Sequence, residues 1–138
     1  MAEHLQLRIV TPLRLVLDEE VTEVTAPGTA GQFGVLPRHC TFLSTLEIGP
    51  LVYKSERGAR SVAVRGGFAE VNNDVMTVLA DAAEFPDEID TARAEQALRE
   101  SSAALVQIPP SDERFASVEA ERQWAQTRLE VARGRAGN

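Results

Sequence analysis

Cysteine and histidine are scarce in this sequence. Its 138 residues include one cysteine, Cys40, and two histidines. A single cysteine cannot form an internal disulfide, and one thiol with two imidazoles falls short of the four ligands of an ordinary zinc site. We therefore expect no metal site, and the composition suits a reducing compartment.

Long apolar runs are also absent. Asp, Glu, Arg or Pro interrupts every apolar stretch well before the roughly 18 to 20 residues that are needed to cross a bilayer. The first residues, Met1 to Gln6, lack the basic segment and apolar stretch of a signal peptide. We therefore expect a chain that stays in the cytosol, with no direct membrane insertion.

Positive charge is in deficit. The chain has 14 Lys and Arg against 21 Asp and Glu, which gives a net charge of -7 at pH 7. Nucleic acids are bound mainly by Lys and Arg that neutralise phosphates, so this balance argues against a nucleic-acid partner. The length leaves room for one ordinary domain, or for a small domain with an appendage, and excludes a large multidomain enzyme.

The composition of the chain changes near Pro86. Seven of the nine glycines precede this position, and the first part alternates apolar and polar residues in short segments separated by turn residues. This pattern predicts an antiparallel β-sandwich or barrel over residues 1–86, with about nine strands. Residues 72–74 (Asn-Asn-Asp) predict a hairpin turn with positive φ at Asn.

The residues after this boundary have a helical period. They predict a helix over 88–106 that is capped by Asp87 or Asp90 and stopped by Pro109-Pro110. The apolar positions of this helix share one face. They are Ala94, Leu98, Ser101 and Leu105.

A second helix is predicted from near Ser111-Asp112, so residues 87–138 form an antiparallel αα-hairpin. Its stripe comprises Phe115, Val118, Ala125, Leu129 and Ala132. Alanine and serine dominate the two contact faces, so the hairpin buries little apolar area by itself. An element held so weakly can detach and rearrange.

Three groups of residues invite a chemical interpretation. His39-Cys40 could form a thiol nucleophile, but neighbours on a strand point to opposite faces, which favours a structural role. Glycines 28, 31 and 34 are followed by strand sequence rather than a helix, which favours tight turns over a phosphate loop. The acidic triplet over 18–20 is typical of a solvated loop. We predict no catalytic residue.

Arginine is concentrated in the predicted hairpin, which carries seven, whereas the chain has a single lysine, Lys54. Guanidinium groups bind carboxylates and phosphates bidentately, so this hairpin could meet a nucleotide or an acidic partner. The same arginines could instead pair with the acids interspersed along the two helices. The pattern alone leaves both alternatives open.

Several blocks of the sequence resemble the epsilon subunits of F-type ATP synthases. They are Pro27-Gly-Thr-Ala-Gly-Gln-Phe-Gly-Val-Leu-Pro-Arg-His39, Leu46-Glu-Ile-Gly-Pro-Leu51, Arg65-Gly-Gly-Phe-Ala-Glu-Val71 and Val75 to Ala80 with Asp81 and Ala83-Glu84. The resemblance covers the chain and implies a ten-stranded β-sandwich followed by a two-helix hairpin. It also implies a non-catalytic rotor subunit that requires no cofactor.

The same resemblance implies a set of partners. The sandwich is expected to bind the gamma subunit and the c-ring, and the hairpin to reach the alpha and beta subunits and inhibit ATP hydrolysis. The expected location is the cytoplasmic face of the bacterial inner membrane, reached only through the complex. The rival hypothesis is a free-standing ligand-binding sandwich, or a thiol enzyme that uses His39 and Cys40.

Two sets of site residues follow from the resemblance. Ile89-Asp-Thr-Ala-Arg-Ala94 is similar to the segment that binds ATP in some bacterial epsilon subunits, which makes ATP an optional regulatory ligand. The implied nucleotide site comprises Glu84, Ile89, Asp90, Arg93, Ala94 and Arg128. The implied c-ring contact comprises Gly31, Gln32, Phe33, Gly34, Arg38 and His39.

The chain also departs from these motifs. It carries Ser117 and Trp124 where the nucleotide-binding relatives have further arginines. It carries Gln32 where many relatives have a carboxylate.

Overall fold

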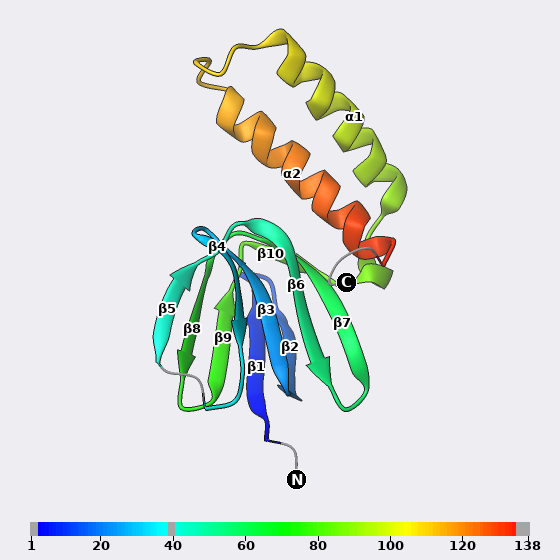
Figure 1. Cartoon of the computed structure of the whole chain (residues 1–138). Helices are drawn as coiled ribbons and strands as arrows, with labels where there is room; N and C mark the ends of the chain where they lie inside the picture. Colours follow the sequence, from blue (N-terminus) through cyan, green and yellow to red (C-terminus); the bar gives the residue numbers. More distant parts are fainter. Residues whose placement is uncertain (1–2, 39–40, 135–138) are drawn as a thin grey trace.

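Two five-stranded sheets and a helical hairpin make up the computed structural model, which describes residues 3–38 and 41–134 (Figure 1). The order in sheet A is β2-β1-β9-β8-β5, and the order in sheet B is β10-β7-β6-β3-β4. The strands are β1 (Leu5–Val10), β2 (Leu15–Val21), β3 (Glu23–Gly28), β4 (Gly31–Val35), β5 (Phe42–Thr45), β6 (Ile48–Ser55), β7 (Gly58–Arg65), β8 (Phe68–Asn72), β9 (Val75–Leu79) and β10 (Ala82–Glu84). The predicted fold class, a β-sandwich followed by two helices, is confirmed.

One strand pair departs from the antiparallel expectation. β1 and β9 are parallel, with Gln6 opposite Val75 and Val10 opposite Leu79. A parallel pair needs a long crossover, and here the crossover includes most of sheet B. Alternation along a single strand carries no information about such a long-range partner. The alternating pattern also did not identify strand β10, which has only three residues.

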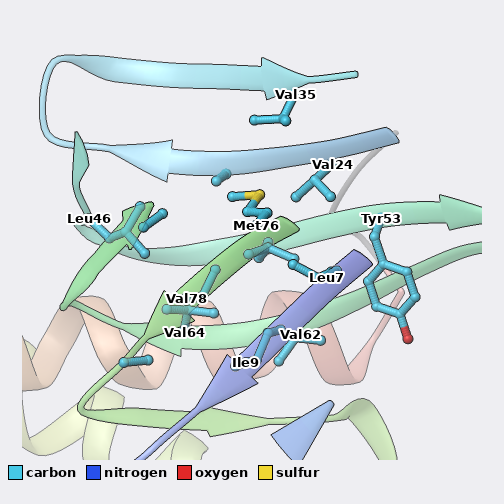
Figure 2. Close-up of a cluster of buried hydrophobic side chains, with 14 of the residues drawn as sticks. Leu7, Ile9, Val24, Val35, Leu46, Tyr53, Val62, Val64, Met76 and Val78 are labelled. Atoms are coloured by element: carbon cyan, nitrogen blue, oxygen red, sulfur yellow. The ribbon is translucent and has the colours of Figure 1, made fainter. Parts of the chain in front are cut away.

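The core lies between the two sheets and contains the inward-facing residues of both. Figure 2 shows Leu7 and Ile9 of β1 among side chains from β6, β7 and β9. Each of these two side chains is completely buried. Burial of a large aliphatic side chain contributes about 1.5–3 kcal/mol, so this core is the main source of stability.

Two turns of sheet A require special backbone conformations. Asn73 (φ 50°) and Asp74 (φ 58°) form the tight turn between β8 and β9, as the sequence predicts. Gly67 precedes β8 at φ 98°, and a Cβ atom there would lie 1.9 Å from the carbonyl oxygen of Leu79. The chain can therefore pass this point only with glycine.

The first helix begins later than the sequence predicts. Residues Pro86–Glu88 form a 3₁₀ turn, η1, because the Glu88 carboxylate accepts from the backbone N–H of Phe85 at 2.9 Å. Helix α1 (Thr91–Gln107) then starts from Asp90, whose side chain accepts from the N–H of Arg93 at 3.1 Å. Asp90, rather than Asp87, is the cap.

Helix α2 (Phe115–Ala132) also starts later than expected. The Asp112 carboxylate accepts from the backbone N–H of Arg114 at 2.8 Å and from its Nη2 at 2.8 Å, which stabilises a turn before the helix. This hydrogen-bonded guanidinium lowers the pKa of Asp112 to about 2. Residues predicted as the first turn of the helix therefore belong to the connection.

The two helices pack side by side as an antiparallel pair, and the loop that joins them lies away from the sandwich (Figure 1). Ala94 and Ser101 on α1, with Ala125 and Leu129 on α2, are buried. These positions belong to the predicted contact faces. In the part of the chain that the structure describes, neither helix is both long enough and apolar enough to cross a bilayer.

Candidate functional surfaces

The residues of the predicted nucleotide site lie where the hairpin joins the sandwich. Glu84 ends β10, and Arg128 projects from α2 toward it. Arg128 Nε lies 2.7 Å from Glu84 Oε1, and Nη2 lies 3.4 Å from Oε2. The side chains of Arg128 and Glu84 are 18% and 28% exposed, respectively, so the pair is partly shielded from bulk water. The structure thus brings these two predicted residues into direct contact.

The other four predicted residues surround the start of α1. Asp90 caps the helix, and Ala94 is buried. Ile89 packs against Ala63 of β7, among apolar side chains rather than polar groups. Arg93 is exposed, and its guanidinium has no side-chain partner among the described residues. Arg93 is therefore the free donor of the set, whereas a phosphate at Arg128 must displace the Glu84 carboxylate.

A second group at this junction was not predicted from the sequence. Trp124 of α2 lies under two guanidinium groups, with Arg65 Cζ 5.9 Å and Arg128 Cζ 5.8 Å from its ring centroid. Arg65 Nη2 also lies 3.0 Å from Glu121 Oε1. The steps of three and four from 121 to 124 and 128 place these side chains on one helical face. This spacing could have indicated from the sequence that the three side chains lie together. A helical face that carries charged residues usually faces solvent, however, so the sequence did not predict its contact with the sandwich.

The predicted c-ring contact residues Gly31–Gly34 form the first part of β4, directly after the turn at residues 29–30; we call residues 28–34 the Gly31 turn. Gly31 has φ 119°, and a Cβ atom on Gly28 would lie 2.7 Å from the carbonyl oxygen of Gly31, so this tight approach depends on glycine. Gln32 and Gly34 are exposed. Phe33 is half-buried and stacks edge-on against Phe42, with centroids 5.4 Å apart. The turn therefore presents backbone and one neutral side chain.

Arg38 lies at the other end of the sandwich. Its backbone N–H donates to Asp74 Oδ1 at 2.6 Å, in the turn between β8 and β9, and its Nη2 lies 2.8 Å from Glu3. The length of β4, about 17 Å for five residues, separates it from the Gly31 turn. The structure therefore divides the predicted contact between two ends, and His39 and Cys40 lie outside the described residues.

An exposed apolar row crosses the outer face of sheet A. The strand register places Leu15, Val10, Leu79 and Phe68 side by side on four adjacent strands. Leu15, Leu79 and Phe68 are 51%, 40% and 42% exposed, and Leu13 in the neighbouring turn is 93% exposed. We call these five residues the apolar row.

The apolar row borders an open hollow of about 370 Å³. The hollow is lined by Val10, Thr11, Pro12, Gly67, Phe68, Leu79, Ala80 and Asp81. Contiguous exposed apolar surface of this kind is typical of a site for a protein partner. The row ends beside the Gly31 turn, because Thr45 pairs with Phe68 and its hydroxyl lies 2.7 Å from that of Thr29.

The described residues provide no obvious centre for metal chemistry. Within residues 3–38 and 41–134, no group of three or more His, Cys, Asp or Glu side chains is arranged to hold a metal ion. The features that stand out are an apolar surface, a glycine-dependent turn and a charged junction.

Comparison with known proteins identifies one family. Residues 4–86 match the model of the ATP synthase delta/epsilon chain β-sandwich domain. The chain is 46% identical over 132 residues to the ATP synthase epsilon chain of Geotalea uraniireducens strain Rf4, with 96% of each chain covered. It is 48% identical over 132 residues to that of Trichlorobacter lovleyi, again with 96% of each covered.

Solved structures agree with this match. A chain in the cryo-EM structure of the Euglena gracilis mitochondrial ATP synthase (OSCP/F1/c-ring) superposes with a TM-score of 0.78 at 27% identity. The alignment covers 96% of this chain and 82% of that one. A chain of the Tetrahymena thermophila mitochondrial ATP synthase shares the fold, with a TM-score of 0.59 at 11% identity over 92% and 95% of the two chains.

Proposed function

The chain belongs to the ATP synthase delta/epsilon family, as an epsilon chain, and from that membership we propose that it is a non-catalytic rotor subunit of the central stalk. In this role it couples the gamma subunit to the c-ring. It is held at the cytoplasmic face of a bacterial inner membrane through these partners. Its C-terminal hairpin restrains ATP hydrolysis by contact with the alpha and beta subunits.

The apolar row is the observation that carries the proposal for gamma. Leu79 and Phe68 form the half of the row nearer the Gly31 turn and remain about 40% exposed, although equivalent side chains on the inner face of sheet A are fully buried. A stable protein interface buries roughly 800 Å² on each partner, with apolar anchors at its centre. The outer face of sheet A offers such anchors, bordered by the polar residues Arg8 and Glu70.

The Gly31 turn is the part of the sandwich that we assign to the c-ring. It adjoins the apolar row, so one end of the sandwich can contact gamma and the ring together. Gln32 can supply neutral hydrogen bonds there, and the exposed backbone of Gly34 adds further donors and acceptors. Arg38 and His39 are the less direct candidates, because Arg38 lies at the opposite end, engaged by Glu3 and Asp74.

The regulatory part of the proposal depends on how little apolar surface fixes the hairpin. In the second apolar cluster, only Ala63, Ile89 and Val131 are buried among the described residues. An element with few buried contacts opens at low cost, as a moving regulatory element must. ATP is an optional ligand of the docked form, through Arg93 and, in competition with Glu84, through Arg128.

A pull-down from detergent-solubilised membranes tests the rotor assignment. The tagged chain should capture gamma and c subunits, and Phe68→Gln combined with Leu79→Gln should weaken that capture at least tenfold, since anchor residues typically contribute 2 kcal/mol or more. Val106→Gln is the matched control, because Val106 is an apolar side chain that is 81% exposed on α1.

Two results would contradict the assignment. One is equal capture of gamma by the double variant and the control. The other is turnover by the isolated chain that is lost in Cys40→Ala, which would favour the thiol-enzyme hypothesis.

A further inference from the structure

Two ion pairs join the hairpin to the sandwich, and they have opposite polarity. The sandwich supplies the cation to one pair, where Arg65 of β7 meets Glu121 of α2 at 3.0 Å. It supplies the anion to the other, where Glu84 of β10 meets Arg128 of α2 at 2.7 Å. Arg65 and Glu84 lie on the face of sheet B that is turned toward α2. Each partner therefore offers both signs of charge to the other.

The single tryptophan of the chain joins these two pairs. Trp124 lies between positions 121 and 128 on α2, and both guanidinium carbons are within 6 Å of its ring centroid. A guanidinium over an indole face gains about 0.5–1 kcal/mol at exposed sites and more when desolvated. Arg65 and Arg128 thus each make one carboxylate contact and one indole contact.

Little apolar packing supports this group. Ala63 of β7 and Val131 of α2 are fully buried beside it and Ile89 is nearly so, while Trp124 and Ala132 pack against these three and are partly buried. This cluster is much smaller than the core of the sandwich, so polar contacts contribute a larger share of the docking free energy. Those contacts are only partly buried, and dissolved salt can screen them.

The chain before α1 is fixed independently of this group. Glu88 accepts from Arg14 at 2.7 Å and from the N–H of Phe85 at 2.9 Å, which ties η1 to the sandwich. Ile89 and Asp90, which follow η1, have extended backbone. Rotation at these two residues can move both helices without disturbing η1.

We propose that Arg65, Trp124, Arg128, Glu84 and Glu121 form an electrostatic latch that docks the hairpin on the sandwich without any ligand. Ionic strength sets the docked fraction, and release pivots at Ile89 and Asp90. Nucleotide is not required for docking, because the Glu84 carboxylate already pairs with the Arg128 guanidinium that a phosphate would otherwise bind. The latch is a property of the isolated chain and does not depend on assembly with the other subunits.

Fluorescence of Trp124 in the purified full chain tests the latch, because the chain has no other tryptophan. Without nucleotide, raising NaCl to about 1 M, where the Debye length is about 3 Å, should increase acrylamide quenching of Trp124. Glu84→Gln should lower the ratio of docked to undocked hairpin about fivefold at low salt. Hydrogen exchange over 115–132 should accelerate in parallel, which separates undocking from a local change at the indole.

The matched controls are Glu113→Gln and Arg99→Gln. Both are exposed hairpin charges with no side-chain partner among the described residues, and neither should change quenching. Charge reversal keeps the test informative if a single variant unfolds. Arg65→Glu alone should undock the hairpin, and adding Glu121→Arg should restore docking.

The latch is overturned if quenching and exchange respond to neither salt nor Glu84→Gln, if the controls respond equally, or if charge reversal does not restore docking. It is also overturned if docking appears only when ATP is added. None of these results would affect capture of gamma by the apolar row, so the two proposals fail separately.

Discussion

The sandwich and the hairpin are built from different interactions. Among the described residues, eighteen buried apolar residues form the core of the sandwich, whereas three form the apolar cluster between α2 and the sandwich. The hairpin adds charged contacts at its junction and small side chains between its helices. This difference supports the proposal that the sandwich is a permanent platform and that the hairpin is a part that can leave it.

The largest expected effect comes from the sandwich core. Leu7→Ala removes a fully buried side chain and should lower the free energy of unfolding by about 2–5 kcal/mol. The matched change Leu98→Ala, at a half-buried hairpin position, should cost much less. Chemical denaturation followed by circular dichroism measures both. Equal decreases in the free energy of unfolding for the two variants would contradict the distinction between a stable sandwich and a weakly held hairpin.

A smaller effect is expected at the start of α1. Asp90→Ala removes the side-chain acceptor for the N–H of Arg93, and loss of such a cap costs about 1 kcal/mol. The loss of stability should be confined to the hairpin. Hydrogen exchange of the α1 amides should therefore accelerate, while the β1 amides stay protected. Asp87→Ala is the control, because Asp87 is exposed and caps no helix. Faster exchange in β1 as well would show that the two parts unfold together.

The smallest expected effect depends on pH at the connection between the helices. Hydrogen bonds from Arg114 lower the pKa of Asp112 to about 2. Because the folded value is below the unfolded one, the contribution to stability is complete above the unfolded pKa and is lost as pH falls through about 2. A carboxyl NMR titration should give a midpoint near 2 that rises toward about 4 in Arg114→Gln. An unchanged midpoint in the variant would contradict the contact.

Local patterns predicted much of this molecule. Alternation identified most of the strands, Asn73 adopts the expected positive φ, and Asp90 is the expected cap. These features depend on residues close together in the sequence. The family resemblance added the tenth strand and linked Glu84 with Arg128 in one site, and the structure shows these two in contact.

Features that depend on distant contacts could not be predicted. The parallel pairing joins β1, the first strand in the sequence, to β9, the next to last. Nothing in either strand alone specifies this pairing. Arg38 is close to the Gly31 turn in sequence but lies at the far end of β4. The charged side of α2 resembled a solvent face, although Trp124 packs there against Arg65.

We propose different roles for the two parts: the sandwich binds within the synthase, and the hairpin restrains hydrolysis. The most direct test is ATP hydrolysis by a synthase assembled with the chain truncated after Pro86, compared with the full chain, after denaturation has shown that the truncated sandwich unfolds cooperatively. We predict that the truncated chain remains in the complex and that hydrolysis rises. Loss of the truncated chain from the complex, or an unchanged rate with the chain still bound, would contradict the account.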